Sequence, residues 1–293
     1  MKFITKETKP GPGIPDNAPE KRRFFQFFEI LGAKITKLMQ LNFIYLLCLI
    51  PLIFGLYFSF TLNPEIHDFS DLARVPLLTF APDYLSLIVL IVSVFITGPA
   101  TAGFVFVLRN MQRREHTWVF SDFFEHFKKN FAKASLMSAI DLVVYIMLYI
   151  AFSFYMFIMP SEVPEMGTMM PAVASGIVAC IAIVFTWAHY YIYTIMVTFD
   201  LEFKHIIKNS IMFAVGKLPL NLLITLIVGA IVVGMVYIMA YSIAVFSIIF
   251  ALIAVALIGL IIVFSTYPTI DALMLKRVRE KQKGARVLNT RDE

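Results

Sequence analysis

The chain has 293 residues, of which 59% are hydrophobic and 15% are charged, and its formal net charge at pH 7 is +5. A soluble domain carries about 25% charged residues, so this composition excludes an ordinary water-soluble protein and predicts one that is solvated mainly by lipid. The positive charge lies in short blocks beside apolar segments, where it suits contact with anionic lipid and gives no reason to expect nucleic-acid binding. Both cysteines, Cys48 and Cys180, lie inside apolar segments, which indicates neither a disulfide framework nor a metal site.

The N-terminal region is predicted to form a tail and a surface helix. Residues 1–20 contain four prolines and two glycines and have little apolar surface to bury, so we expect a flexible cytoplasmic tail ahead of a membrane domain at 21–275. Residues 24–39 carry apolar side chains at helical spacing, which predicts an amphipathic helix along the inner membrane surface. The first apolar segment, 41–61, is long enough to cross a bilayer and lacks the cleavage site of a signal peptide.

The second predicted span, 84–108, is interrupted by the sequence TGPATAG at residues 97–103. A binding site would need such a break, but so would close helix packing. We expect a kink at Pro99, where the hydroxyls of Thr97 and Thr101 satisfy backbone groups that the proline frees. The small residues of this segment would admit a neighbouring helix, so we interpret it as a packed kink in preference to a substrate site.

A phenylalanine-rich segment, FSDFFEHFKKNF at residues 120–131, follows the second span. Its phenylalanines recur at i, i+3, i+4, i+7 and i+11, which predicts a second surface helix. This helix and the cations near it form a candidate face for a partner or for lipid. The residues assigned to that face are Arg109, Arg113, Arg114, Phe123, Phe124, Phe127, Lys128 and Lys129.

The rest of the chain contains four more apolar segments. Residues 218–270 carry no charged side chain over 53 positions, which is too long for one crossing of a hydrocarbon core of about 30 Å and predicts a turn near residues 240–242. Small residues in the fourth span (Ala172, Gly176, Cys180) would allow close helix contact, within the bundle or with another protein. The predicted spans are 134–159, 173–199, 218–240 and 242–273, which brings the total to six; a basic tail, 276–293, follows.

Two short similarities suggest an internal repeat. A third surface helix is predicted at 200–213, and residues 203–209 share Phe, His, Lys and Asn with 124–130 at the same offsets. The sequence Thr-Tyr-Pro ending at Pro268, near the inner end of span six, resembles Thr-Gly-Pro in span two and predicts a second kink. We therefore expect an all-α polytopic membrane protein of three tandem units, each a surface helix followed by a transmembrane hairpin.

Cationic residues are distributed unevenly between the loops. Of the 25 Lys and Arg residues, 24 lie before residue 41, within 109–133 or 200–217, or after residue 270. The opposite loops, 62–83 and 160–172, carry acidic side chains instead. Cation-rich short loops stay in the cytoplasm, so we expect both termini on the cytoplasmic side of a bacterial cell membrane.

Motifs typical of enzymes are absent from the sequence, which has no GxxxxGK[ST], HExxH, CxxC or GxSxG. The loops are also too short to fold into a catalytic domain. We therefore expect no enzymatic activity, no cofactor and no metal site. An enzyme of envelope-polymer metabolism would need a polar cleft that the sequence does not display.

Two ionisable residues lie deep inside predicted spans. Asp141 is about 10 Å and His189 about 16 Å from the inner ends of spans three and four. Such groups are rare in membranes and by default suggest a functional site, so the two could pair across adjacent helices and, with Tyr145 and Tyr190, relay a proton. The alternative is a purely structural hydrogen bond between neighbouring helices, with the Asp neutral or paired.

Several spaced segments together carry a family resemblance. They are TGPATA at 97–102, Leu-Arg at 108–109, FSDFF at 120–124 and FKKNF at 127–131, preceded by Leu-Asn at 41–42. This pattern resembles the YesL-like family of bacterial integral membrane proteins, designated domain of unknown function 624. The resemblance implies a membrane protein of Gram-positive bacteria, commonly encoded beside carbohydrate ABC importers and sugar-responsive two-component systems. It supplies no catalytic residue.

These observations favour a non-enzymatic accessory or regulatory protein associated with a carbohydrate importer. It would contact the bilayer and either the permease subunits of the importer or a membrane sensor kinase. The rival hypothesis is a small transporter or channel that uses Asp141 and His189 together with the helix breaks at Pro99 and Pro268. The sugar, the partner and the oligomeric state stay open.

Overall fold

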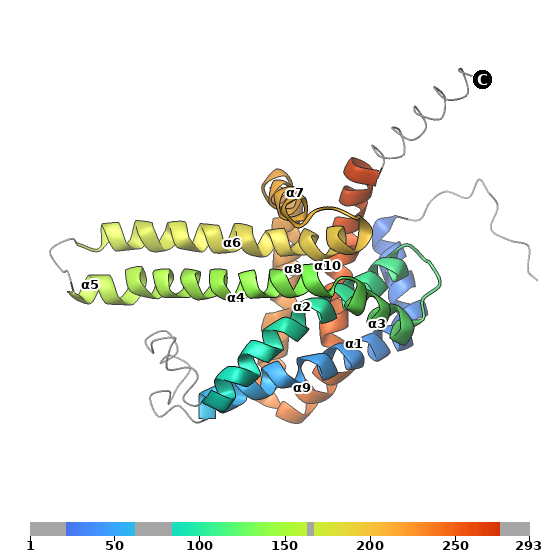
Figure 1. Cartoon of the computed structure of the whole chain (residues 1–293), viewed down its shortest axis with the longest axis horizontal. Coiled ribbons are helices and arrows are strands. Elements are labelled where there is room, and N and C mark those ends of the chain that lie inside the picture. Colours follow the sequence, from blue (N-terminus) through green and yellow to red (C-terminus); the bar gives the residue numbers. More distant parts are fainter. Residues whose placement is uncertain (1–21, 62–83, 163–166, 276–293) are drawn as a thin grey trace, which may run out of the picture.

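The computed structural model describes residues 22–61, 84–162 and 167–275 (Figure 1). The tails predicted at 1–20 and 276–293 and the acidic loop at 62–83 lie outside the described residues. Within the described part, all regular structure is helical, and six helices are long and apolar enough to cross a membrane. The predictions of an all-α fold with six spans are therefore confirmed, and the protein is a multi-pass membrane protein.

The helices follow the order expected from hydropathy. The first hairpin is formed by α1 (Arg23–Thr61) and α2 (Tyr84–Gln112), and the second by α4 (Phe131–Ser153) and α6 (Met169–Thr198). The third is formed by α8 (Leu218–Tyr241) and a helix that runs from α9 (Ile243–Ile249) into α10 (Val255–Ile270). Two short helices, α3 (Val119–Lys129) and α7 (Phe203–Gly216), precede the second and third hairpins, and α5 (Met159–Glu162) extends α4. π-Helical turns occur at Phe154–Ile158, Phe250–Ala254 and Asp271–Leu275.

Two local features differ from or sharpen the sequence predictions. Residues 24–39 do not form a separate surface helix, because α1 is continuous through them into the first span. No glycine or proline separates the two stretches, so the hydrogen-bonded helix has no reason to end there.

The turn expected near 240–242 is at Ser242, whose extended backbone ends α8 and whose Oγ accepts a hydrogen bond from the Val245 N–H at the start of α9.

The three hairpins meet near α3 and α7 and diverge from there (Figure 1). In that view the α4/α6 and α1/α2 hairpins extend toward the left, whereas α8 and α10 run downward. The second helices of the hairpins, α2, α6 and α10, contact one another and form the centre of the molecule. In the most apolar 18-residue stretch of α2, 56% of the residues are buried, compared with 6% in the corresponding stretch of α8. Of the six spans, α2 is therefore the most enclosed.

The TGPATAG segment lies in the most crowded part of α2. A Cβ atom added to Gly98 would collide with the Ala134 carbonyl and the Ser138 side chain of α4, and one added to Gly103 would come within 2.5 Å of the Phe123 carbonyl oxygen of α3. Only glycine permits both approaches, because any side chain would push the neighbouring helix away. The segment is therefore a packing site on two sides of α2.

Pro99 and Pro268 each leave a backbone carbonyl without its usual helical partner, and another element supplies a donor in each case. Pro99 frees the Phe95 carbonyl, which accepts a hydrogen bond from Ser135 Oγ of α4 at 2.9 Å. Pro268 frees the Phe264 carbonyl, which accepts from Arg23 Nη2 of α1 at 3.1 Å. In lipid an unsatisfied carbonyl costs several kcal/mol, so these bonds link the helices at their prolines.

The π-helical turn between α9 and α10 is bonded to the first helix of the chain. Asn42, which is fully buried in α1, donates from Nδ2 to the carbonyls of Phe250 (2.9 Å) and Ala251 (2.8 Å). Its Oδ1 accepts from the Ala256 N–H at 2.9 Å. A π-helical turn displaces backbone groups from the ordinary hydrogen-bond pattern, and one amide side chain satisfies three of them here.

Candidate functional site: a carboxylate–imidazole pair beside a central cavity

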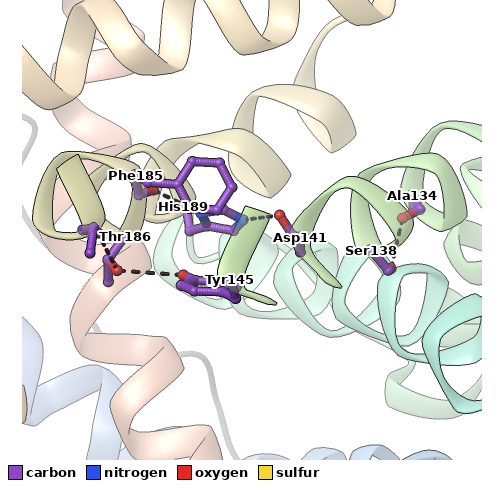
Figure 2. A network of polar contacts seen from close by, with 8 residues as sticks. Ala134, Ser138, Asp141, Tyr145, Phe185, Thr186 and His189 are labelled. Atoms are coloured by element: carbon purple, nitrogen blue, oxygen red, sulfur yellow. Dashed lines mark hydrogen bonds and ion pairs between the residues drawn. The ribbon is translucent and has the colours of Figure 1, made fainter. Parts of the chain in front are cut away.

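The structure brings Asp141 of α4 and His189 of α6 together (Figure 2). His189 Nε2 lies 2.7 Å from Asp141 Oδ1, and His189 Nδ1 lies 2.9 Å from the Phe185 carbonyl oxygen. The side chain of Asp141 is 19% exposed and that of His189 is 18% exposed, although most residues of the apolar stretches of α4 and α6 are not buried. The pairing across adjacent helices that the sequence suggested is therefore present in the structure.

The hydrogen bonds determine how the protons are placed. A carbonyl oxygen can only accept, so Nδ1 of His189 must carry a proton toward Phe185. The short contact to Asp141 then needs a second proton, held either on the imidazole or on the carboxyl group. The pair is neutral overall in both arrangements, which is how two ionisable groups can lie inside a bilayer at low cost. Chemically, the site can pass a proton between two atoms 2.7 Å apart.

The two tyrosines expected to extend this pair are placed differently. Tyr145 lies beside the His189 ring and its hydroxyl is 3.4 Å from Thr186 Oγ1 (Figure 2). Tyr190 instead directs its hydroxyl to Thr225 of α8, at 2.9 Å. The side chains of His189 and Tyr190 leave α6 about 100° apart, as consecutive residues of a helix do. The expected four-residue relay therefore does not form a continuous chain.

A cavity of about 200 Å³ lies on the other side of His189, among α1, α2, α6 and α10. Six lining residues carry polar groups (Tyr45, Thr101, His189, Tyr190, Tyr193 and Thr194), and the other lining residues are apolar. Tyr45 Oη and Thr101 Oγ1 are 3.0 Å apart across the α1–α2 contact. His189 contributes to the wall of this cavity, but both of its ring nitrogens are bonded, to Phe185 and to Asp141, so proton exchange with the cavity requires one of these bonds to open.

The candidate face at the basic ends of the spans is smaller than expected. Phe123 is fully buried and Arg109 is 8% exposed, so neither belongs to a surface that a partner or a lipid could touch. Phe123 packs against Gly103, which the spacing of the phenylalanines alone could not reveal. Phe124 and Phe127 are half-buried, and Lys128 and Lys129 are exposed. Two arginines at this face form ion pairs, Arg113 with Glu115 and Arg114 with Glu29.

Arg109 has a structural role at the end of α6. Its Nη1 donates to the Val197 carbonyl at 2.8 Å and to Thr198 Oγ1 at 3.3 Å. Its Nη2 donates to Asn110 Oδ1 at 2.9 Å, and its Cζ atom lies 4.5 Å from the centre of the Phe106 ring. A cation at the C-terminal end of a helix is favoured by the helix dipole. Arg109 therefore joins α2 to α6, and within the described residues its hydrogen bonds go to neutral oxygen atoms.

Sequence reasoning missed the polar side chains that join the hairpins. The family motif includes Asn42, but hydropathy and spacing predict no contact for Asn42, Ser135 or Asn221. Asn221 of α8 donates to the Ala214 carbonyl at 2.8 Å and accepts from the Tyr191 hydroxyl at 2.6 Å. Asn42 and Asn221 could have been found as asparagines in apolar segments, where an amide needs partners. For Ser135 the available signal was Pro99, because a proline frees the carbonyl four residues before it and that carbonyl then needs a donor from another helix. Within the described residues, no group of three or more His, Cys, Asp or Glu side chains could hold a metal.

Comparison with known proteins agrees with the motif pattern. Residues 38–152 match the family model described as "Protein of unknown function, DUF624". The matched stretch begins within α1 and reaches nearly to the end of α4, and so contains Asn42, the TGPATAG segment, α3 and Asp141. No curated protein and no solved structure matches the chain. The resemblance to the YesL-like DUF624 family is confirmed over these residues.

Proposed function

We propose that the protein is a non-enzymatic accessory or regulatory subunit that packs against the membrane spans of a bacterial carbohydrate importer of the ABC class. The observation that carries the proposal is an open apolar groove of about 650 Å³ along α6. It is lined by Val173, Gly176, Ile177, Cys180, Ile181, Val184 and Phe185 of α6 and by Ile211 of α7.

The groove has the chemistry that suits a transmembrane helix of another protein. Ala172, Gly176 and Cys180 follow one another at intervals of four residues and are exposed, and a Cβ atom added to Gly176 would meet nothing within 4 Å. Small residues at this spacing let a second helix approach closely, and here no helix of the described chain uses them. The family resemblance implies a genetic association with carbohydrate importers, which points to permease subunits as the occupants.

The test fills the groove and measures recovery of a defined partner. Tagged protein is purified from native membranes in mild detergent, and permease subunits of carbohydrate importers are quantified by mass spectrometry. We expect Gly176→Trp to reduce that recovery strongly, and Val233→Trp, on the exposed face of α8, to leave it unchanged. Failure to recover any permease with the unaltered chain would refute the proposal, and so would equal recovery with both variants.

A second candidate function is transport of a proton or a small polar solute. It is favoured by the ionisable pair of Asp141 and His189 inside the spans, and by the cavity that His189 helps to line. Flux is measured in proteoliposomes with a pH-sensitive dye inside. This function requires flux that Asp141→Asn abolishes and Asp200→Asn, on an exposed carboxylate outside the spans, preserves. Absence of flux for every sugar and ion tested counts against it.

A further inference from the structure

The basic end of the bundle contains a polar cavity that neither candidate function uses. It measures about 370 Å³ and lies between the junction of α3 with α4 and the C-terminal end of α6. His126, Lys129, Asn130 and Lys133 line it from one side, and Met196, Val197, Thr198, Phe199 and Asp200 from the other.

The cavity exists because two chain turns are fixed beside it. Asn130 separates α3 from α4, and both its backbone N–H and its Nδ2 donate to the His126 carbonyl, at 3.1 and 3.0 Å. On the other side, α6 ends at Thr198 and Phe199 continues in an extended conformation. Arg109 holds this end in place from behind through the Val197 carbonyl. The walls are therefore set by hydrogen bonds, so the site is largely formed before any ligand arrives.

The charges around the cavity favour an anion. Lys129 and Lys133 line it, and the guanidinium of Arg109 donates to two further lining residues, at the Val197 carbonyl and Thr198 Oγ1. The one carboxylate of the lining is Asp200, whose Oδ1 is 3.2 Å from Lys133 Nζ. The Asp200 side chain is fully exposed, and ion pairs of that kind contribute little, so a stronger anion can replace it on Lys133.

We propose that this cavity binds a phosphate group, with the ammonium groups of Lys129 and Lys133 on the phosphate oxygens and the second Nδ2 proton of Asn130 as a neutral donor. Phosphate is the anion that suits it, because its oxygens can accept from several donors at once and two lysines balance its charge. The cavity is beside the first turn of a span, where a phospholipid headgroup can enter from the bilayer and a soluble phosphate ester can enter from water. The two sources present the same chemistry to the lysines.

The experiment uses the full chain in nanodiscs and compares two double variants of equal net charge. Lys129→Gln/Lys133→Gln removes the two lining cations, and Lys128→Gln/Lys208→Gln removes two lysines that do not line the cavity. For a lipid source, nanodiscs contain equal parts of phosphatidylcholine and phosphatidylglycerol, and native mass spectrometry counts the phosphatidylglycerol retained. For a soluble source, nanodiscs contain phosphatidylcholine alone, and glycerol 3-phosphate is titrated while the thermal midpoint is followed.

We expect the lining variant to bind at least about tenfold more weakly than the control variant in at least one arm, because it loses both ammonium donors; tenfold corresponds to about 1.4 kcal/mol. Asp200→Asn should bind more tightly than the unaltered chain, because it removes the competing carboxylate. The arm that responds identifies the source. If both double variants lost the same amount of binding, general surface charge would explain the loss and the proposal would be overturned. Absence of binding in both arms would overturn it as well. Thermal midpoints measured without phosphate or phosphatidylglycerol show that each variant is folded.

Discussion

At the scale of single residues, Gly98 is the position where sequence and packing are most tightly connected. Its α-carbon lies against the Ala134 carbonyl and the Ser138 side chain, so a methyl group there would force α2 and α4 apart. We predict that Gly98→Ala lowers the free energy of unfolding by about 1–3 kcal/mol, measured by thermal unfolding in detergent. Gly229→Ala is the control, since a Cβ atom at Gly229 meets nothing within 4 Å. A Gly98→Ala protein as stable as the control would contradict the packing described here.

His126 provides a prediction about pH, because it lies in α3, outside the spans. Burial lowers the pKa of His126 below its usual value near 6.5, and the hydrogen bond to the Asp122 carbonyl opposes this only in part. The folded state therefore binds this proton less readily than the unfolded chain does. The contribution of His126 to stability is complete above pH 6.5 and is lost as the pH falls toward the lowered pKa.

The variant His126→Phe tests this dependence, because a phenyl ring can keep the stacking on Phe106 and cannot titrate. Thermal midpoints of both proteins are measured between neutral and mildly acidic pH. We expect the unaltered chain to lose more stability than the variant over that interval. Parallel curves would show that His126 titrates alike in the folded and unfolded states.

At the scale of helices, the hydrogen bond from Ser135 to the Phe95 carbonyl compensates for Pro99. Ser135→Ala is expected to cost about 1–3 kcal/mol, since it leaves the carbonyl freed by Pro99 without a donor. In a Pro99→Ala background the backbone N–H of residue 99 can bond to that carbonyl, so Ser135→Ala should then cost much less. The measurement is a double-mutant cycle of unfolding free energies. Additive effects would mean that the serine and the proline are independent.

The sequence predicted helices more successfully than it predicted contacts. Hydropathy and length were enough to locate all six spans, and Asp141 and His189 could be paired because ionisable groups inside a bilayer need partners. The burial of Phe123 could not be predicted, because it depends on which face of α2 carries Gly103 and on how α3 crosses it. The direction of Tyr190 likewise depends on the rotation of α6 against α8. Helical periodicity gives the faces of a helix, but not the neighbour that each face meets.

For the whole molecule, the distribution of lysine and arginine predicts that α3 and α7 lie on the cytoplasmic side. Single cysteines introduced at Lys128, at the end of α3, and at Gly167, between α5 and α6, test this orientation in a chain with Cys48 and Cys180 replaced by alanine. In intact cells, an impermeant maleimide should label the cysteine at 167 and should label the one at 128 only after permeabilisation. The reverse pattern would invert the orientation and would place the phosphate cavity on the outer surface.

The hydrogen bonds of α1 impose an order of events on biosynthesis. Asn42 bonds to the π-helical turn ahead of α10, and Arg23 bonds to the Phe264 carbonyl within α10, so α1 depends on a helix that is synthesised after it. Until α10 is inserted, the amide of Asn42 has none of its partners and α1 cannot reach its final packing. Packing of α1 against α10 is therefore a late step. In a chain stalled before α10, the Asn42 amide, which is buried in the finished molecule, has no hydrogen-bond partner inside the bilayer. The three hydrogen bonds of Asn42 can therefore form only in molecules whose α10 is already in place.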